Sequence, residues 1–508
     1  MALTAPPARR DSLVVLGGGF LLLVLLLQLK PIDDVDIFWQ VKLGQLMLAT
    51  GGLIEHDIFT YTHPGAPNPT LGWLAQVIYA GLYDLGGWRA IQILHVTLFA
   101  AAFVVAGLTA SRLPSRGRYP VLFSLVIGLY LGLMAGLSNA DVRPQSFALL
   151  GFAAVLYLAR LGPLTARGLV GIGLIAILWQ NTHPSLSLGV LAVGALAAGE
   201  WLTKWRYPDH TSPLFLTSAT LILALAQLAT PMGWQIFEVS AANLHVARDL
   251  LGTSEWLPPW SSAVRPAMMG FFLSAGIALV LLIARKRDLR SADWLLLLVM
   301  TGLALYAARF AVFWGIALIP LWTQWLETLR PMHRFAWTDI PWRPRTLRLA
   351  GLTGLVGVYA LPALIQGPPL FRDSLTACLQ TLASAIPAGR IYNFREWGGP
   401  LILEGYPRWQ VTIDGRLYIF ADQDWRDYAA VSQGGVEVGE ILAWYKPDAF
   451  VLHPTYQAPL IRMLDVSGKF HQIFNDKNCA IYISRRHPPD QEISPREGSQ
   501  RFLDSPST

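Results

Sequence analysis

Carboxylates follow directly on an apolar run near the start of the chain. The segment PIDDVDIFWQVKLG, residues 31–44, places Asp33, Asp34 and Asp36 immediately after LVVLGGGFLLLVLLLQL. Ionised groups beside hydrocarbon are costly and rare without a task, so this acidic group is a candidate functional site. In an extended segment the side chains of Asp34 and Asp36, two residues apart, would leave the chain on the same side. Such a pair could accept a proton or bind a divalent cation.

Further acids, histidines and arginines recur near the ends of apolar segments. Cations that bind a phosphate, together with a carboxylate that accepts a proton, are what a reaction on a lipid-borne anionic substrate needs. The candidates for substrate binding are Asp57, Arg143, His183, Arg248, Glu255 and Arg309. For any one of these groups alone, solvation or pairing at a helix end is the competing interpretation. Six tryptophans are interpreted as residues of an interfacial aromatic belt: Trp39, Trp73, Trp88, Trp234, Trp256 and Trp260.

The composition is that of a membrane protein. Of the 508 residues, 53% are hydrophobic and 14% charged, against about 25% charged in a typical soluble domain. Runs of about 17 to 25 apolar residues predict about eleven transmembrane helices. These runs are 13–29, 90–110, 120–137, 144–160, 166–180, 184–201, 213–230, 267–284, 291–307, 308–327 and 347–366. The short amphipathic segment 71–84 is predicted to lie in the membrane interface.

Lysine and arginine gather in alternate loops between these runs. If Arg9 and Arg10 are cytoplasmic, roughly eighteen basic residues fall on the cytoplasmic side, and the opposite loops are poor in them. This asymmetry predicts a multi-pass protein of the cytoplasmic membrane with its N-terminus inside. The loops 31–70 and 231–266 and the chain from residue 367 onward would then be outside. The net charge of +6 therefore reflects membrane topology, and no nucleic-acid partner is expected.

The last quarter of the chain changes character. Short strand-like runs such as IPAGRIYNF and DAFVLHP alternate there with helical segments. The pattern predicts a transmembrane domain over 1–366, a small extracytoplasmic α/β domain over 367–485 and a disordered tail over 486–508. Cys378 and Cys479 both lie in the outer region, and whether they form a disulfide is left open by the sequence.

Motifs of several other enzyme classes are absent from the sequence. It holds no cysteine and histidine pattern with zinc spacing, no Walker loop, no G-x-G-x-x-G after a strand and no G-x-S-x-G. ATP-driven, redox and serine-hydrolase functions therefore lose their best support.

A series of short motifs runs along the chain in a fixed order. They are D-x-D with an aromatic pair and a glycine (Asp34 to Gly44), D-x-F-x-[YF]-T (Asp57 to Thr62), W-L (Trp73), R-P-Q (Arg143), N-x-H (Asn181), E-W (Glu255), W-G-G (Trp397) and I-D-G-R (Ile413). In these motifs the chain resembles the GT-C superfamily of membrane glycosyltransferases, and more closely a poorly characterised bacterial group within it. The resemblance implies a polytopic α-helical membrane protein of GT-C-like fold with a small C-terminal α/β domain. Gln40 departs from the histidine usual in the group, so no role for an imidazole carries over there.

The resemblance also implies an activity. It is the transfer of a hexosyl or pentosyl group from a polyprenyl-phosphate donor to an extracytoplasmic glycan, lipid or protein acceptor, with inversion at the anomeric carbon. The superfamily's base role falls on Asp34 or Asp36. Our hypothesis is that Asp36 is the base, with Asp34 as its partner or as a metal ligand. We expect both beside a cavity walled by the loops near Arg143, His183 and 231–266. Mg²⁺ or Mn²⁺ would suit carboxylate ligands, although the sequence requires no cofactor and leaves metal ligands unknown.

Two other functions fit parts of the sequence. A transporter is disfavoured because the ionisable groups cluster at one face and no inverted repeat is visible. A non-catalytic membrane assembly or scaffold protein, binding partners through its outer α/β domain, is excluded by nothing in the sequence. The acids of the outer loops would then be structural. Even in a transferase, the turn at I-D-G-R is expected to hold Asp414 and Arg416 as a structural pair rather than as substrate contacts.

The predicted topology can be tested by cysteine labelling from outside the cell. A single cysteine at Ser432 should react with a membrane-impermeant reagent, whereas one at Ser115 should not, because the basic loops stay in the cytoplasm. Equal labelling of both positions, or the reverse pattern, would contradict the model.

Overall fold

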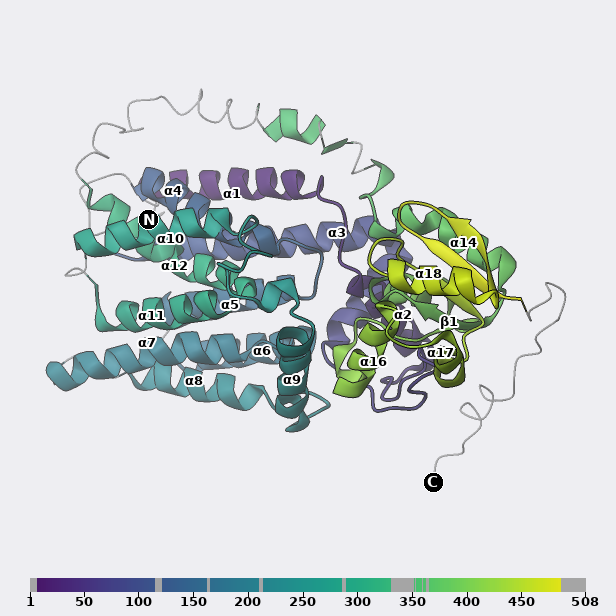
Figure 1. Ribbon diagram of the computed structural model, residues 1–508. Helices are drawn as coiled ribbons and strands as arrows, with labels where there is room; N and C mark the ends of the chain where they lie inside the picture. Colours follow the sequence, from purple (N-terminus) through teal and green to yellow (C-terminus); the bar gives the residue numbers. More distant parts are fainter. Residues whose placement is uncertain are drawn as a thin grey trace. The chain divides into compact units, whose positions relative to one another are not determined.

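The chain divides into two compact units in the computed structural model (Figure 1). Unit 1 comprises Met1–Asp34, Leu43–Leu53 and Pro69–Pro369, and unit 2 comprises Val35–Lys42, Ile54–Asn68 and Leu370–Thr508. The structure describes residues 7–114, 121–161, 165–209, 213–285, 289–329, 351, 353–358, 360–361 and 365–485. The predicted tail, 486–508, lies outside these residues. The predicted first outer loop is thus divided between the two units.

Unit 1 is helical. Its helices are α1 (Pro7–Leu27), α3 (Trp73–Arg112), α4 (Val121–Gly136), α5 (Gln145–Leu161), α6 (Ala166–Thr182), α7 (Ser187–Arg206), α8 (Leu214–Ala226), α9 (Gln235–His245), α10 (Met269–Arg285), α11 (Ser291–Tyr306) and α12 (Ala311–Glu327), with short turns η1 (Leu137–Asn139), η2 (Val246–Leu250), η3 (Ser254–Trp256) and η5 (Ala308–Phe310). Helix α2 (Asp36–Thr50) has residues in both units. The first ten predicted apolar runs each overlap one of these helices. The eleventh, 347–366, is described only at residues 351, 353–358, 360–361 and 365–366, which are helical.

By length and composition, two helices in the described part of the chain are long and apolar enough to cross a membrane. They are Trp73–Arg112, which bends at Gly86 and Gly87, and Leu122–Asn139. Several shorter apolar helices accompany them, and eleven crossings stay a prediction.

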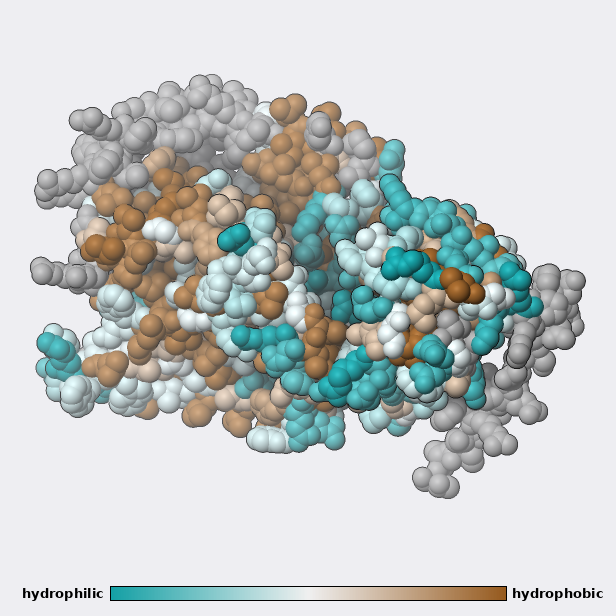
Figure 2. Space-filling model, viewed as in Figure 1, coloured by the Kyte–Doolittle hydropathy of each residue, from teal (hydrophilic) through white to brown (hydrophobic). Residues whose placement is uncertain are grey.

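The surface of the shorter helices is itself apolar. Leu174 on α6, Leu225 on α8, Val280 on α10 and Leu298 on α11 are each more than half exposed. In Figure 2 hydrophobic residues spread over the helices of unit 1. Contiguous exposed apolar surface is rare on soluble monomers and is typical of a surface that lipid covers.

Helix α12 forms the centre of unit 1. All of its residues are buried, as expected of a helix that is hydrophobic on every side. Its closest neighbour, α4, presents glycines at four-residue spacing, Gly128, Gly132 and Gly136. A Cβ on any of the three would come within 2.8 Å of an α12 side chain. The small residues therefore allow the two helices to approach closely, as in membrane helix pairs.

Charged residues lie at both ends of α5 and α11. Arg160, near the end of α5, pairs with Asp293 at 3.0 Å in the first turn of α11, and Arg290 adds a second contact at 3.1 Å. At the opposite ends lie Arg143, just before α5, and Arg309, just after α11. A helix of 17 residues such as α5 is roughly 25 Å long. Charge at the two ends with apolar residues between is the pattern of a membrane-spanning helix.

Unit 2 is built on a five-stranded sheet in the order β2-β1-β3-β5-β4. The strands are β1 (Gly389–Asn393), β2 (Trp409–Val411), β3 (Ala449–Leu452), β4 (Phe470–Asn475) and β5 (Ala480–Ser484), and the helices and short turns are η8 (Phe371–Leu375), α14 (Thr376–Ala385), η9 (Arg395–Trp397), α15 (Gly398–Gly405), η10 (Leu417–Ile419), α16 (Asp422–Ser432), α17 (Val438–Tyr445) and α18 (Ala458–Ser467). Strands β2, β1 and β3 are parallel to one another. Strand β5 pairs antiparallel with β3, and β4 pairs antiparallel with β5. All four residues of the central strand β3 are buried.

Part of the predicted first outer loop extends this sheet. Thr60 pairs with Val411 in a parallel bridge beside β2, and the Tyr61 hydroxyl lies 2.6 Å from the Thr412 hydroxyl. Elsewhere in unit 2, Cys378 and Cys479 form a disulfide with 6.3 Å between their Cα atoms. Both contacts join segments that are far apart in the sequence into one domain.

A buried arginine fixes the turn of I-D-G-R against the same loop. The Arg416 guanidinium lies 2.6 Å from a carboxylate oxygen of Asp414 and 2.6 Å from one of Asp57, and all three side chains are fully buried. The pairing predicted for Asp414 and Arg416 is confirmed. We call these three residues the Arg416 cluster. Burial opposes a charged arginine, but the two carboxylates outweigh it and raise the pKa of Arg416.

Removing the arginine from this cluster should lower the stability of unit 2. Arg416→Gln would leave two buried carboxylates without their cation, a change that typically costs about 3–5 kcal/mol. We expect a clear drop in the melting temperature of the full chain in detergent. Arg426→Gln, at an exposed position of α16, should leave the melting temperature almost unchanged. Equal effects of the two substitutions would mean that the cluster is not a structural element.

The labelling experiment requires a different outer position. Ser432 is 7% exposed, and its hydroxyl accepts a hydrogen bond from the Gln457 amide at 3.0 Å. A cysteine there would react slowly on either side of a membrane. Its neighbour Gln433 is exposed and is the better outer probe, whereas Ser115 lies outside the described residues.

Candidate functional site

Four of the predicted site residues meet in unit 1. The Arg143 guanidinium forms ion pairs with both Asp34 and Glu255, and Arg309 pairs with the second oxygen of Glu255 at 3.2 Å. We call Asp34, Arg143, Glu255 and Arg309 the Arg143 cluster. The side chain of Asp34 is only 4% exposed, and burial of an ionised carboxylate is tolerated because the arginine neutralises it.

The elements around Arg143 hold the cluster in place. Lys30, just before the acidic segment, pairs with Asp141 at 2.6 Å, so two ion pairs join residues 30–34 to residues 141–143. The side-chain amide of Gln145, the last residue of R-P-Q, lies 3.4 Å from the Arg309 carbonyl oxygen. These contacts connect the end of α1, the start of α5 and the end of α11.

Two tryptophans predicted for an interfacial belt, Trp73 and Trp256, contact residues of the sequence motifs and of the Arg143 cluster. The indole of Trp73 donates a hydrogen bond of 2.8 Å to Asn181 in N-x-H. The indole ring of Trp256, in E-W, lies 4.1 Å from the Arg309 guanidinium carbon, a cation–π contact that restrains the arginine. Each of these two tryptophans therefore has a structural contact, and their place in an interfacial belt stays a prediction.

The electrostatics of the cluster fix two protonation states. Burial would raise the pKa of Glu255, but the guanidiniums of Arg309 and Arg143 outweigh it and lower this pKa to about 2. For His183, burial and the nearby Arg309 charge both lower the pKa, to about 3. Its Nδ1 atom lies 2.8 Å from the Ser185 hydroxyl. At neutral pH the Glu255 carboxylate in the cluster is therefore ionised, and the imidazole of nearby His183 is neutral.

Asp36 has a different environment. It begins α2, so the extended geometry expected for D-x-D ends at this residue, and the two aspartates belong to different units. Its half-buried carboxylate accepts a hydrogen bond of 3.0 Å from the Trp39 indole. A Cβ at Gly415 would collide with the same carboxylate oxygen. The single cavity expected to hold both Asp34 and Asp36 stays a prediction.

The sequence missed these two neighbours of Asp36. Trp39 is 6% exposed, so its main role is not that of a belt residue. Its position three residues after Asp36 in a helix is the spacing at which side chains meet, and this was the available signal. Gly415 carries no comparable signal, because its contact joins segments far apart in the sequence.

The two other candidates, Asp57 and Arg248, are not members of the Arg143 cluster. Asp57 belongs to the Arg416 cluster in unit 2, and it also caps the following turn by accepting hydrogen bonds from the backbone N–H groups of Phe59 and Thr60, at 3.2 and 3.1 Å. The guanidinium of Arg248 lies 3.9 Å from the ring centre of Tyr306. Roles of Asp57 and Arg248 in substrate binding stay predictions.

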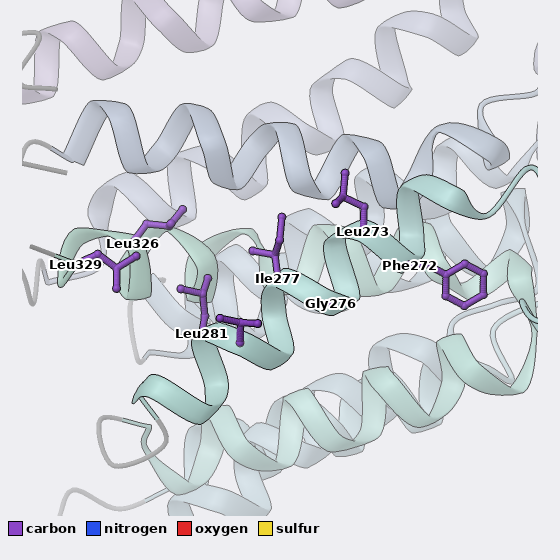
Figure 3. A pocket seen from close by; sticks show the side chains of 8 residues that line it. Phe272, Leu273, Gly276, Ile277, Leu281, Leu326 and Leu329 are labelled. Atoms are coloured by element: carbon purple, nitrogen blue, oxygen red, sulfur yellow. The ribbon is translucent and has the colours of Figure 1, made fainter. Parts of the chain in front are cut away.

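Within the described residues no group of three or more histidine, cysteine and acidic side chains is arranged to hold a metal ion. One cavity of about 470 Å³ opens between α10 and the end of α12, and Figure 3 shows its aliphatic and aromatic lining. Its residues are Phe272, Leu273, Gly276, Ile277, Val280, Leu281, Leu326 and Leu329. None of them can transfer a proton or bind a phosphate, so this groove is no site for the chemistry.

The chain is similar in structure to a known protein, although not in sequence. No protein-family model and no curated protein matches the chain. Among solved structures, the cryo-EM structure of the arabinofuranosyltransferase AftD from mycobacteria is similar, with 14% sequence identity, a TM-score of 0.49 and coverage of 95% of this chain. The chain spans 40% of the length of that one. The site residues themselves, rather than this likeness, are the basis for assigning a function.

The charge state of Glu255 can be tested by its pH dependence. Folding lowers its pKa from 4.5 to about 2, so this group stabilises the fold fully above pH 4.5 and loses its contribution as the pH falls toward 2. The contribution is roughly 3 kcal/mol, since one pKa unit corresponds to about 1.4 kcal/mol. Glu255→Gln should therefore lower the melting temperature clearly at pH 7 and by less at pH 3.5.

Glu437→Gln, at an exposed position, serves as the matched control and should melt like the wild type at both pH values. If the melting temperatures of the wild type and Glu255→Gln differ by the same amount at pH 7 and pH 3.5, the arginines do not lower the pKa of Glu255.

Proposed function

We propose that this chain is a membrane glycosyltransferase that moves a sugar from a polyprenyl-phosphate donor to an extracytoplasmic acceptor with inversion. The observation that carries the proposal is the Arg143 cluster, in which two arginines are held at the ends of apolar helices beside the acidic segment. A site for an anionic lipid headgroup requires cations at the ends of apolar helices. The order of motifs shared with GT-C glycosyltransferases adds to this support.

The reaction needs three things from the protein. As the bond between the anomeric carbon and the phosphate oxygen breaks, its electron pair goes to that oxygen, so the leaving lipid phosphate gains a second negative charge, which guanidinium groups stabilise. An acceptor hydroxyl oxygen forms the new bond to the anomeric carbon from the opposite side. A carboxylate takes the proton of that hydroxyl.

Arg143 and Arg309 are the candidates for binding the phosphate. Both are already held by Glu255, so their positions are set before any substrate arrives. A site preorganised in this way does not spend binding energy on reorientation during the reaction. His183 is neutral in this environment and can donate or accept a hydrogen bond without adding charge.

The two aspartates divide the remaining tasks. Asp34 is buried and ion-paired with Arg143, and a proton transfer to it would break that pair, so we assign it to holding the arginine. Asp36 is half-buried, and the Trp39 indole orients one of its oxygens. We therefore assign Asp36 as the base that accepts the acceptor's proton. Divalent metal ions are not required by this scheme.

The test is a transfer assay on the full chain in liposomes with labelled polyprenyl-phosphate sugars and a membrane extract as the acceptor source. Asp36→Asn keeps the size of the side chain and removes the basic oxygen, so turnover should fall by about 10²- to 10⁴-fold without a loss of expression. The neighbouring exposed Asp33 offers the matched control, and Asp33→Asn should transfer sugar at the wild-type rate.

Near-normal transfer by Asp36→Asn would contradict the assignment of the base. A wild-type chain that transfers no sugar from any tested donor would favour the rival function, a scaffold that binds partners through unit 2. The Arg416 cluster fits that rival as well, because its paired acids are already used to hold the fold.

A further inference from the structure

The parallel strands of unit 2 create an edge at which ligands commonly bind. After β1 the chain continues through α15 to β2 on one side, whereas after β3 it continues through α18 toward β4 on the other. Loops that leave neighbouring parallel strands in opposite directions form a crevice outside the carboxyl ends of those strands. In this unit that position lies between the segment after Asn393 and the segment after Leu452.

Aromatic rings from both segments gather at this edge. Phe394 and Tyr456 stack with 5.6 Å between ring centres and 3° between their planes. His453 lies 4.6 Å from Tyr456 and stacks on Trp397 at 5.6 Å. Tyr456 is 63% exposed, although Phe394 and His453 both lie close to its ring. Much of the Tyr456 side chain is therefore open to solvent.

Polar groups of His453 and Glu396 belong to the same two segments as the Tyr456 and Phe394 rings. The Nδ1 atom of His453 accepts hydrogen bonds from the backbone N–H groups of Thr455 and Tyr456, at 3.1 and 3.4 Å. The imidazole hydrogen must then be on Nε2, which can donate. Burial lowers the pKa of His453, so the ring is neutral at pH 7. The partly exposed carboxylate of Glu396, whose charge acts on His453, can accept hydrogen bonds from hydroxyl groups.

The turn that carries these groups is rigid. The side-chain oxygen of Gln457 accepts a hydrogen bond from the His453 backbone at 3.2 Å, and its amide donates to Ser432 at 3.0 Å. On the other segment, the Arg395 backbone donates to the Tyr428 hydroxyl at 2.8 Å. Rings and polar groups held in fixed positions bind a ligand with little ordering cost.

We propose that Phe394, His453 and Tyr456 form the core of a binding site for a sugar ring of a neutral glycan. The negative face of an aromatic ring attracts polarised C–H groups, and one face of a sugar ring is a row of such groups. The sugar hydroxyls would accept a hydrogen from the imidazole Nε2 and donate to Glu396. Because Arg395 is already paired with Glu396 at 3.4 Å, the neutral imidazole and this carboxylate suit hydroxyl groups rather than a phosphate. The site lies within unit 2 and does not depend on the transfer reaction proposed above.

Saturation-transfer NMR on the full chain in nanodiscs, without any lipid-linked donor, tests this site. The probes are neutral trisaccharides of glucose, mannose, galactose and arabinose. We expect at least one to bind the wild type and Tyr456→Phe, which keeps the ring. Tyr456→Ala should weaken the same binding by about tenfold, the loss expected from one stacking contact. The matched control is Trp444→Ala on α17, because Trp444 is similarly exposed, at 55%.

Binding that Trp444→Ala weakens as much as Tyr456→Ala does would overturn the proposal, because it would reflect nonspecific contact with exposed rings. Failure of every trisaccharide to bind would overturn it too. Competition by inorganic phosphate would show that Arg395 recognises an anion there, which is a different site. Melting curves of both Tyr456 variants check that the fold is intact. Because no donor is present, a negative result here leaves the transfer reaction to be judged by its own assay.

Discussion

Neutralisation of buried carboxylates by arginine is the constraint on which both units depend. An unpaired charge in the interior costs several kcal/mol, and the acidic segments place carboxylates there at Asp34 and Asp57. Arg143 neutralises the first and Arg416 the second. Arg143 also contacts Glu255, and Arg416 also contacts its near neighbour Asp414. Each arginine thus joins segments that are far apart in the sequence and that local structure could not hold together.

This constraint separates the two residues of D-x-D. Asp34 is tied to Arg143 among the helices of unit 1, whereas Asp36 begins α2 and is oriented by Trp39 in unit 2. Two carboxylates so close in sequence thus have different surroundings, and surroundings decide whether a carboxylate holds a cation or accepts a proton. The proposed division, with Asp34 positioning an arginine and Asp36 acting as the base, follows from that difference.

Local patterns in the sequence predict the elements better than the contacts between them. The apolar runs coincide with helices, and IPAGRIYNF and DAFVLHP contain β1 and β3, because buried parallel strands read as continuous apolar runs. Strand β4 escapes this rule, since it is an edge strand whose middle residues are exposed. Helix α2 was missed because its acidic start resembles a loop. The pairing of Arg143 with Glu255 spans 112 residues, and no periodicity carries information over such a separation.

The central claim is that sugar leaves a lipid phosphate and arrives on an acceptor with inverted configuration. The most direct measurement follows the anomeric carbon itself, using polyprenyl-phosphate sugars labelled with ¹³C at that carbon and NMR of the product formed by the full chain in liposomes. We expect a glycosidic signal of the opposite anomeric configuration, with one polyprenyl phosphate released for each sugar transferred. A signal that stays on the phosphate, a product of retained configuration, or free sugar released at the same rate without acceptor would contradict it.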